Sequence, residues 1–526
     1  MESSTLARSP TSAAAAAAAA IVTLLLGVCF AKLLLLLSRQ NPTRRKPNYA
    51  PIAGTIFHQL LNIHRLVDYH TTISRRHKTF RMLTPSCNYV YTVDPANVEY
   101  ILKTNFANYG KGELSYSVMR DLLGDGIFAV DGDKWRQQRK IASFEFSAKV
   151  LRDFSSVVFR NTAAKLANIV AEFASSYQMM DIQDLFMKST LDSIFKVGFG
   201  VELDTLSGSN EEGRKFAKAF DDSSCQLLRR FLDVSWKVKR FLNIGSEAEM
   251  KRNIKLIDDF VYKLIDKKSE QMSKQRGDFV SHLMSSQMKK EDILSRFLIE
   301  RERGSDNIED RYLRDIILNF IIAGRDTTAG TLSWLLYMLC KHPHVQEKVA
   351  QEVREAIGIK DNAAMDEFAA CLTEEAINQM QYLHASLTET LRLYPAVPLD
   401  AKCCFSDDTL PDGFDVKKGD MVNYQPYPMG RMKFLWGEDA EEFRPERWFN
   451  EDGVFVTESP FKFAAFQAGP RICLGREFAY RQMKIFAATL LYFFKFKMWD
   501  EKKKVGYRTM LTLQIDGGLH LGAFRR

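Results

Sequence analysis

The stretch that decides the fold of this 526-residue chain reads Phe466-Gln467-Ala468-Gly469-Pro470-Arg471-Ile472-Cys473-Leu474-Gly475. Apolar residues recur at helical spacing after it, which predicts a helix over residues 476–492. Cys473 therefore precedes a helix N-terminus, where free backbone N–H groups and the positive end of the helix dipole stabilise an anion. The position favours a thiolate over a neutral thiol.

The neighbours of Cys473 point the same way. Gly469 and Gly475 let the loop backbone approach a flat cofactor, and Pro470 stiffens the turn. Arg471 places a cation two residues from the sulfur, where it suits an anionic group of that cofactor. A lone cysteine is more often a small buried hydrophobe, but here five fixed identities coincide: Phe466, Gly469, Arg471, Cys473 and Gly475.

The loop resembles the haem-ligand signature of the cytochrome P-450 superfamily, and almost all of the chain after residue 40 carries the family's other motifs in order. The resemblance implies a mainly α fold with a small β portion. It also implies haem b with Cys473 as the axial thiolate ligand of the iron, and Phe466 and Arg471 among the cofactor-binding residues. The resemblance further implies that NADPH and flavins act only through a separate reductase, and in agreement this chain has no dinucleotide fingerprint.

A second segment, residues 315–339, is apolar on all sides, which predicts a buried helix. Its middle reads Ala323-Gly324-Arg325-Asp326-Thr327-Thr328. Thr327 can return its hydroxyl to the carbonyl of Ala323, which loosens the helical ladder. In the family the matching threonine organises proton delivery for oxygen activation and the acid before it relays protons. The resemblance implies these catalytic roles for Thr327 and Asp326.

Two further patterns are weak alone and gain meaning from the resemblance. Trp135 and Arg139 share a helical face, and the family uses such a pair, with Arg471, to bind a haem propionate. Lys402 is a further candidate cation, where many relatives carry an arginine. Glu389 and Arg392 lie three residues apart on one helix face, and the resemblance adds Arg447 as third member of a structural charge triad.

The N-terminus predicts a membrane anchor. Residues 13–37 are almost uninterruptedly apolar, and a helix of that length covers a hydrocarbon core of about 30 Å. Basic residues after the run predict that the bulk of the protein lies on the cytosolic side, and we expect the membrane to be that of the endoplasmic reticulum. We therefore expect a short lumenal segment (1–12), a single-pass signal anchor (13–37), a basic, proline-bearing connector (38–54) and a catalytic domain (55–526). A cleaved secretory peptide is the alternative, although the run ends in five leucines.

Composition limits the possible partners. Hydrophobic residues make up 46% of the chain, and its eight cysteines include no C-x-x-C pair, which suits a reducing compartment. The net charge of +8 comes without a basic stripe with interleaved aromatics, so we expect no nucleic-acid partner. One basic cluster is a candidate docking face for an acidic flavoprotein reductase: Arg136, Arg139, Lys140, Lys149 and Arg152.

The local sequences of residues 123–128 and 436–440 resemble those of the plant branch of the family that hydroxylates fatty acids at the terminal (ω) or in-chain carbons. This favours a monooxygenase that inserts one oxygen atom of O₂ into a C–H bond of a long-chain fatty acid, with Arg229, Arg230 and Lys237 as candidate carboxylate anchors. Another lipophilic substrate stays open, as do a haem-thiolate isomerase or dehydratase acting on fatty-acid hydroperoxides and a membrane-tethered interaction protein.

Overall fold

The computed structural model describes residues 54–84, 88–147, 149–233, 235–279, 292–302, 309–358 and 364–526, together with Gly27. The predicted lumenal segment, signal anchor and connector therefore lie, apart from Gly27 and Gly54, outside the described residues. Within the described ranges, no helix is both long enough and apolar enough to cross a membrane.

Helices dominate the described chain, as predicted. Their bounds are α2 Ile56–Leu61, α3 Leu66–Ser74, α4 Pro95–Glu99, α5 Gly112–Leu123, α6 Gly132–Ser147, α7 Lys149–Ser175, α8 Ile182–Phe199, α9 Glu211–Leu232, α10 Trp236–Leu242, α11 Gly245–Phe279, α12 Ile293–Glu302, α13 Asp310–Ile321, α14 Thr327–Lys341, α15 Pro343–Ile357, α16 Met365–Cys371, α17 Glu374–Gln379, α18 Gln381–Leu393, α19 Pro426–Met429, α20 Lys433–Trp436 and α21 Arg476–Phe493.

The β portion is small. Five strands pair in the order β1-β2-β8-β5-β3, with bounds β1 Thr79–Leu83, β2 Asn88–Thr92, β8 Met421–Tyr424, β5 Asp400–Cys404 and β3 Tyr109–Gly110. Only the β2–β8 pair in this sheet is parallel. The smaller sheets contain β4 Met180–Asp181, β12 His520–Arg525 and β9 Phe494–Met498, then β10 Tyr507–Thr509 with β11 Leu513–Ile515, and β6 Asp408–Thr409 with β7 Asp415–Val416.

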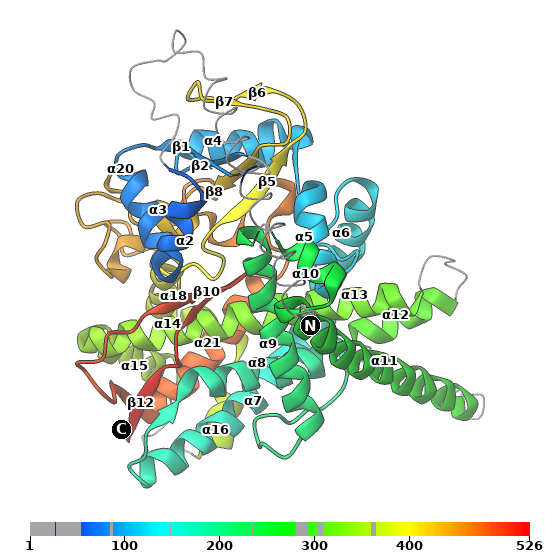
Figure 1. Ribbon diagram of the computed structural model, residues 1–526. Coiled ribbons are helices and arrows are strands. Elements are labelled where there is room, and N and C mark those ends of the chain that lie inside the picture. Colours follow the sequence, from blue (N-terminus) through cyan, green and yellow to red (C-terminus); the bar gives the residue numbers. More distant parts are fainter. Residues whose placement is uncertain are drawn as a thin grey trace, which may run out of the picture.

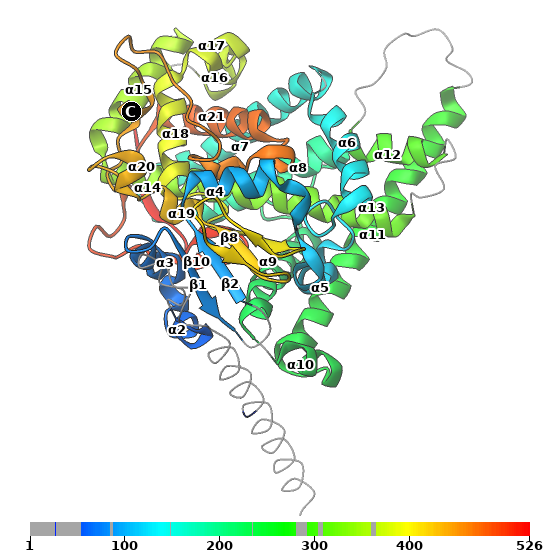
Figure 2. The ribbon, with the colours of Figure 1, turned by 90° about the horizontal axis from the view of Figure 1, so that it is seen from above.

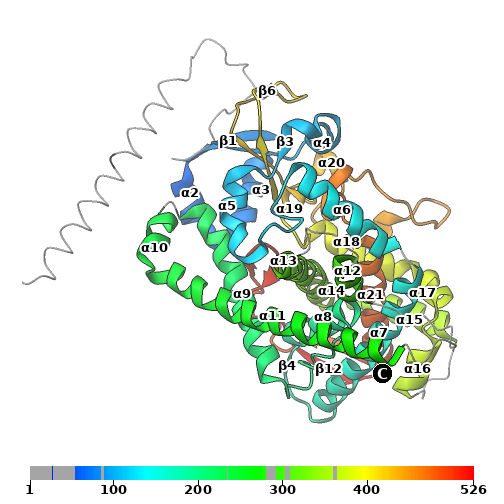
Figure 3. The same cartoon turned by 90° about the vertical axis from the view of Figure 1, so that its right-hand side faces the viewer.

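The five-stranded sheet lies to one side of a larger helical block (Figure 1). From above, its strands lie between α3 and α5 (Figure 2). The largest apolar core joins α7, α8, α14, α15, α18 and α21, and a second joins α5, α8, α9, α11, α12 and α13. α11 runs along α9 and also contacts α13 (Figure 3). The central helix, which is the segment of residues 315–339, therefore borders both cores, since α13 lies in the second core and α14 in the largest.

The helix predicted over residues 315–339 is present but is not continuous α-helix. It runs as α13, a π-helical turn η5 (Ile322–Asp326) and α14. A π-turn widens the backbone locally and often marks a functional site. Trp334 fixes α14 beyond the turn: its ring stacks on Tyr394 at 4.0 Å, and its indole N–H donates to the Leu513 carbonyl at 3.1 Å.

Candidate active site

The cysteine loop is held by its own backbone. The Cys473 N–H donates to the carbonyl of Phe466 at 2.8 Å, which closes the loop just before α21 begins at Arg476, as the sequence predicted. Gly469 adopts a φ of +63°, and a Cβ there would collide with the carbonyl oxygen of Leu102. Only glycine fits this position, because an L side chain disfavours that φ and finds no room.

The Cys473 thiol keeps accessible surface although protein surrounds it. Burial raises the pKa of this thiol, while the Gly475 backbone N–H and the charges of Arg139 and Arg476 act in the opposite direction. The predicted help from the helix terminus is thus present but smaller than the cost of burial. A metal ion bound to the sulfur removes the proton outright, so the site suits a metal-bound thiolate.

Three of the predicted cofactor residues meet at this loop. The Arg471 guanidinium pairs with Asp131 at 2.6 Å and lies over the Trp135 ring at 4.5 Å. Arg139 donates to the carbonyl of Ile472, the residue before Cys473. Arg471 Nε is buried, with no hydrogen-bond partner in the described part of the chain. A buried donor left in this state is available to an anionic group.

Lys402 lies in a second ionic cluster. It is buried on β5 and pairs with Asp400 at 2.6 Å, and Asp400 also binds Lys111 at 2.8 Å and the Tyr424 hydroxyl at 3.0 Å. Burial lowers the pKa of Lys402 to about 7, with the Asp400 charge acting against it. Lys402 is therefore already paired. Sequence reasoning missed Asp400, although the i, i+2 spacing on a strand places Asp400 and Lys402 on one face.

The central helix shows the predicted backbone bond. Thr327 Oγ1 donates to the Ala323 carbonyl at 2.6 Å, across the π-turn. Ala323 itself is exposed although most of the helix around it is buried, and a Cβ on Gly324 would lie 2.9 Å from Ile194 of α8. The turn is thus pressed against α8 on one side and open beside Thr327 on the other.

Asp326 is held by one neighbour that sequence reasoning left without a role. Arg325 pairs with Asp326 at 3.1 Å and forks onto both carboxylate oxygens of Asp221, on α9. Burial raises the pKa of Asp326 to about 7, the Arg325 charge opposes this and the Asp221 charge adds to it. No local sequence pattern predicts that Asp221 pairs with Arg325, because the two residues lie 104 positions apart.

Taken together, these residues fit a haem. The thiol would supply the iron ligand, Gly469 would let the loop backbone approach the haem, and the spare Arg471 donor beside Trp135 would suit a propionate. Phe466 packs beneath the loop, its ring 5.3 Å from Tyr480 of α21. Phe146 of α6 contacts both the central helix and the helix that follows the cysteine loop. Its ring lies 5.8 Å from that of Phe320 of α13 and 5.9 Å from that of Phe478 of α21.

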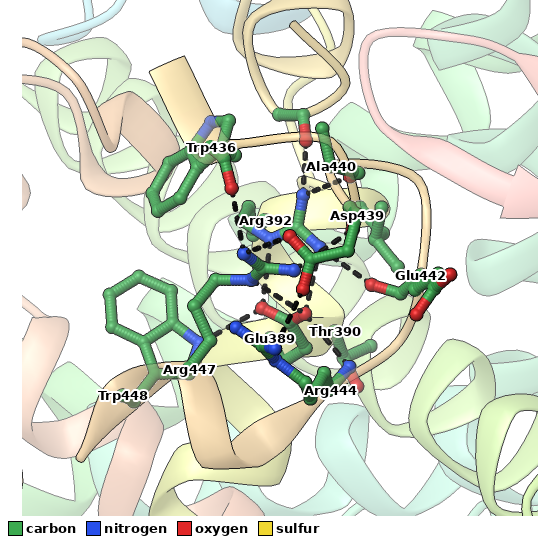
Figure 4. A network of polar contacts seen from close by, with 12 residues as sticks. Glu389, Thr390, Arg392, Trp436, Asp439, Ala440, Glu442, Arg444, Arg447 and Trp448 are labelled. Carbon is green, nitrogen blue, oxygen red and sulfur yellow. Dashed lines mark hydrogen bonds and ion pairs between the residues drawn. The ribbon is translucent and has the colours of Figure 1, made fainter. Parts of the chain in front are cut away.

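The structural charge triad is present as predicted. Glu389 accepts from Arg392 at 2.7 and 2.8 Å and from Arg447 at 3.4 Å, and it also binds the Trp448 indole N–H at 3.0 Å (Figure 4). The Glu389 and Arg392 side chains are both fully buried. The network therefore ties α18 to residues 444–448, which precede the cysteine loop.

The structure changes two predictions, one on the substrate-carboxylate anchors and one on the basic cluster. Arg230 is not a free cation for a substrate carboxylate, because it is buried and pairs with Glu247 at 2.6 Å and Asp121 at 2.8 Å. In the basic cluster, Arg139 turns inward to the cysteine loop and Arg136 pairs with Asp133 at 2.7 Å, which leaves Lys140 exposed. The side chains of Lys149 and Arg152 lie outside the described residues.

Comparison with known proteins agrees with this geometry. The cytochrome P450 family model matches residues 45–520. Cytochrome P450 704C1 of Pinus taeda is 54% identical, over 90% of this chain and 91% of its own length. Cytochrome P450 704B1 of Arabidopsis thaliana is 46% identical, over 91% and 95%, and cytochrome P450 CYP94D108 of Paris polyphylla is 39% identical, over 91% and 93%. The chain belongs to the cytochrome P450 family and is a haem-thiolate monooxygenase, an oxidoreductase.

Proposed function

We propose that this P450 hydroxylates a long-chain fatty acid at the ω or an in-chain carbon, with electrons from NADPH through a separate reductase. The observation that carries the oxygen chemistry is the Thr327–Ala323 bond beside the buried Asp326, on the helix that borders both cores. The fatty-acid class is supported by the resemblance of residues 123–128 and 436–440 to the sequences of plant fatty-acid hydroxylases.

The residues of this chain have separate tasks. When bound, the haem supplies oxygen activation and C–H cleavage, and the protein orients the substrate and controls water and protons. Cys473 would supply the thiolate ligand of the haem iron, and Arg471, Trp135 and Arg139 would hold the haem propionates. Lys402 is paired with Asp400 and would act on the propionates only through that ionic cluster. Asp326 holds a proton that it releases toward Thr327 Oγ1, and Thr327 passes it on toward the oxygen site.

The second core offers apolar side chains of α5, α9 and α13 that would line a substrate site. Val118, Met119, Phe216, Phe220 and Leu227 are buried in the second core together with Ile316 to Ile322. These side chains suit an acyl chain. Of the three candidate carboxylate anchors, Arg229 and Lys237 remain exposed, and Lys237 lies 5.7 Å above the Trp236 ring. We place the anchor at Lys237, on the short helix α10.

A substrate panel tests this proposal. The full-length protein, its reductase and NADPH are incubated with fatty acids of several chain lengths and with matched alcohols and alkanes. We expect NADPH-dependent hydroxylated fatty acids, and a Lys237→Ala protein with a raised KM for acids alone. Turnover of hydroperoxides without NADPH would instead support the isomerase or dehydratase alternative. Cys473→Ser, which should lose the thiolate-type CO spectrum and activity, is the control for the haem ligand.

The reductase is proposed to dock on the side of the cysteine loop. Lys140 is exposed on α6 and follows Arg139, whose guanidinium donates to the carbonyl of Ile472 in the cysteine loop. Lys140→Glu should slow first-electron transfer a few-fold at low salt, and the difference should fade as the Debye length shortens. The exposed Lys267→Glu on α11 serves as the matched charge control. Equal rates for both variants would remove Lys140 from the docking face.

The membrane arrangement remains a proposal that rests on the sequence. Residues 13–37 form the single-pass anchor, 38–54 the connector, and 55–526 the catalytic domain on the cytosolic face of the endoplasmic reticulum. Removal of residues 1–37 should release the protein from carbonate-washed microsomes. Retention of the shortened protein in the washed membranes would place its attachment elsewhere.

A further inference from the structure

A line of aromatic side chains that lose electrons readily runs from the central helix to the protein surface. Trp334 of α14 stacks on Tyr394, and the ring of Tyr394 lies 6.4 Å from that of Tyr427 of α19. The Tyr427 ring lies 5.9 Å from that of Tyr507 of β10. Trp334 and Tyr427 are buried, whereas Tyr507 is partly exposed. We call these four residues the aromatic chain.

The inner end of the aromatic chain lies on the same helix face as Thr327. Trp334 follows Thr327 by seven residues in α14, which is about two turns, so the two side chains lie roughly 10 Å apart along the helix axis. The Trp334 and Tyr394 rings are nearly parallel, with 6° between their planes. Overlapping rings share a positive charge, which lowers the cost of removing an electron. This stacked pair is therefore suited to be the first electron donor.

The outer end of the aromatic chain contains a proton acceptor. Asp68 of α3 is exposed, and its two carboxylate oxygens accept from the Tyr427 hydroxyl at 2.8 Å and from the Tyr507 hydroxyl at 3.0 Å. The Asp68 backbone N–H also donates to the Tyr507 hydroxyl at 3.2 Å. A tyrosine that loses an electron becomes a strong acid, so it needs a base beside its hydroxyl. One carboxylate serves both phenols.

Arg431 gives the aromatic chain a direction. Its guanidinium lies 3.6 Å from the centre of the Tyr427 ring and 5.2 Å from that of Tyr394. A cation this close disfavours a positive charge that stays on either ring. The oxidation is therefore more stable farther out, on Tyr507, because that side chain is partly exposed and Asp68 can pass its proton to solvent.

We propose that the aromatic chain carries one-electron oxidation from the active site to the protein surface, with Asp68 as proton acceptor, and so returns the activated enzyme to its resting state when no substrate is in place. This protective function goes beyond the proposed hydroxylation of fatty acids. It requires only the haem-thiolate monooxygenase activity, and it does not depend on which substrate is oxidised.

Each event moves one electron and one proton. The stacked pair loses an electron to the oxidant that the monooxygenase reaction generates, and Tyr427 replaces this electron while its proton passes to Asp68. Tyr507 then gives an electron to Tyr427, and Asp68 returns the first proton to Tyr427 and takes the proton of Tyr507. A thiol or ascorbate-type reductant restores Tyr507, whose proton returns from Asp68. Two such events, with two solvent protons, deliver the electrons that a substrate C–H bond otherwise supplies.

The test detects the radical as well as its protective effect. The haem-loaded full-length protein is mixed with peracetic acid in the absence of substrate. One sample is frozen rapidly for electron paramagnetic resonance, and another is treated with a nitroso spin trap and digested for mass spectrometry. We expect a tyrosyl radical and a trap adduct on Tyr507. Trp334→Phe keeps a stacked ring but resists oxidation, so the radical should fall severalfold and the haem should bleach severalfold faster.

Asp68→Asn tests the proton acceptor separately. An amide oxygen still accepts hydrogen bonds from both phenols but does not take their protons, so the tyrosyl radical should also fall severalfold while the haem content stays normal. A radical of wild-type size in Asp68→Asn would overturn the role of Asp68. Tyr507→Phe changes only a partly exposed hydroxyl, and it provides the test if Trp334→Phe does not fold. It should lose the trap adduct and bleach faster, and bleaching at the wild-type rate would overturn the protective function.

Tyr337→Phe is the matched control. The Tyr337 ring lies 5.6 Å from that of Trp334 and 6.5 Å from that of Tyr394, but no ring contact in the described part of the chain connects it to Tyr427. This variant should keep the radical and the bleaching rate of the wild type. A loss as large as that of Trp334→Phe, or an unchanged Tyr507 adduct in Trp334→Phe, would overturn the route. Hydroxylation with NADPH and reductase is measured separately, so the failure of this proposal is distinguishable from that of the proposed function.

Discussion

The two buried arginine–carboxylate networks of this P450 differ in how completely they are satisfied. Glu389 receives donors from Arg392, Arg447, the Trp448 indole and the Arg444 backbone (Figure 4). Asp326 makes one such contact in the described part of the chain, to an arginine that also serves Asp221. The first network fixes its carboxylate with several donors, whereas the second leaves its carboxylate with one shared partner.

The difference follows from where the partners come from. Arg392 also donates to the carbonyls of Gly430, Ala440 and Glu442, so its guanidinium is saturated by fixed backbone atoms. Arg325 pairs only with side chains among its recorded contacts, and one of them borders a solvent cavity. A saturated buried ion pair maintains structure, and an incomplete one can serve as a titrating group.

Arg392→Ala should break the first network with the largest effect. It leaves Glu389 buried with fewer donors, and removal of one partner from a buried pair costs about 3–5 kcal/mol. We expect little folded protein and no retained haem, measured as the reduced-CO difference spectrum per milligram. Arg325→Gln is the comparison from the second network and should keep the spectrum. A normal spectrum from Arg392→Ala would mean that the network is not needed to build the haem loop.

The effect of Asp326→Asn on thermal stability should depend on pH, which distinguishes the second network from the first. The pKa of Asp326 is raised in the folded protein to about 7, above its usual value of 3.8. The folded state therefore binds this proton more tightly than the unfolded state, and its stabilising contribution is lost as the pH rises from about 4 to 7. We expect the Tm of the wild type to fall relative to Asp326→Asn over that range. A constant Tm difference between the two proteins would contradict a raised pKa at this position.

Local spacing predicted the Glu389–Arg392 pair of the first network and the Thr327–Ala323 bond beside the second, whereas Arg447 was added by the family resemblance. The i, i+3 spacing of Glu389 and Arg392 and the Thr327–Ala323 bond both lie within one helix, so the sequence contains the whole relation. The position of Cys473 just before a helix and the start of α21 are local as well. All of these predictions are confirmed.

The partners that sequence reasoning missed come from distant elements. Asp221 lies 104 residues from Arg325, and Asp400 lies 289 residues from Lys111. Their pairing depends on how α9 packs on the central helix and how β5 pairs with β3, and no local spacing encodes either contact. Arg230 shows the converse: its helical pattern is ordinary, but α5 and α11 bury it with Asp121 and Glu247.

Asp439→Asn should cause the smallest loss of stability, because Asp439 lies at the partly exposed edge of the first network. Asp439 pairs with Arg447 and Arg444 at 2.9 Å in each case and stays partly exposed. The Arg447 hydrogen bond is the main cause that lowers the pKa of Asp439, so its stabilising charge is present above its usual pKa and is lost as the pH falls through the depressed value. Partly exposed pairs contribute roughly 0.2–1 kcal/mol. Urea unfolding should show a loss of that size at neutral pH that disappears in acid, with haem content unchanged. A loss as large as that of Arg392→Ala would show that the saturated core of the network depends on its rim, and the distinction between fixed and adjustable networks would then rest on Asp326 alone.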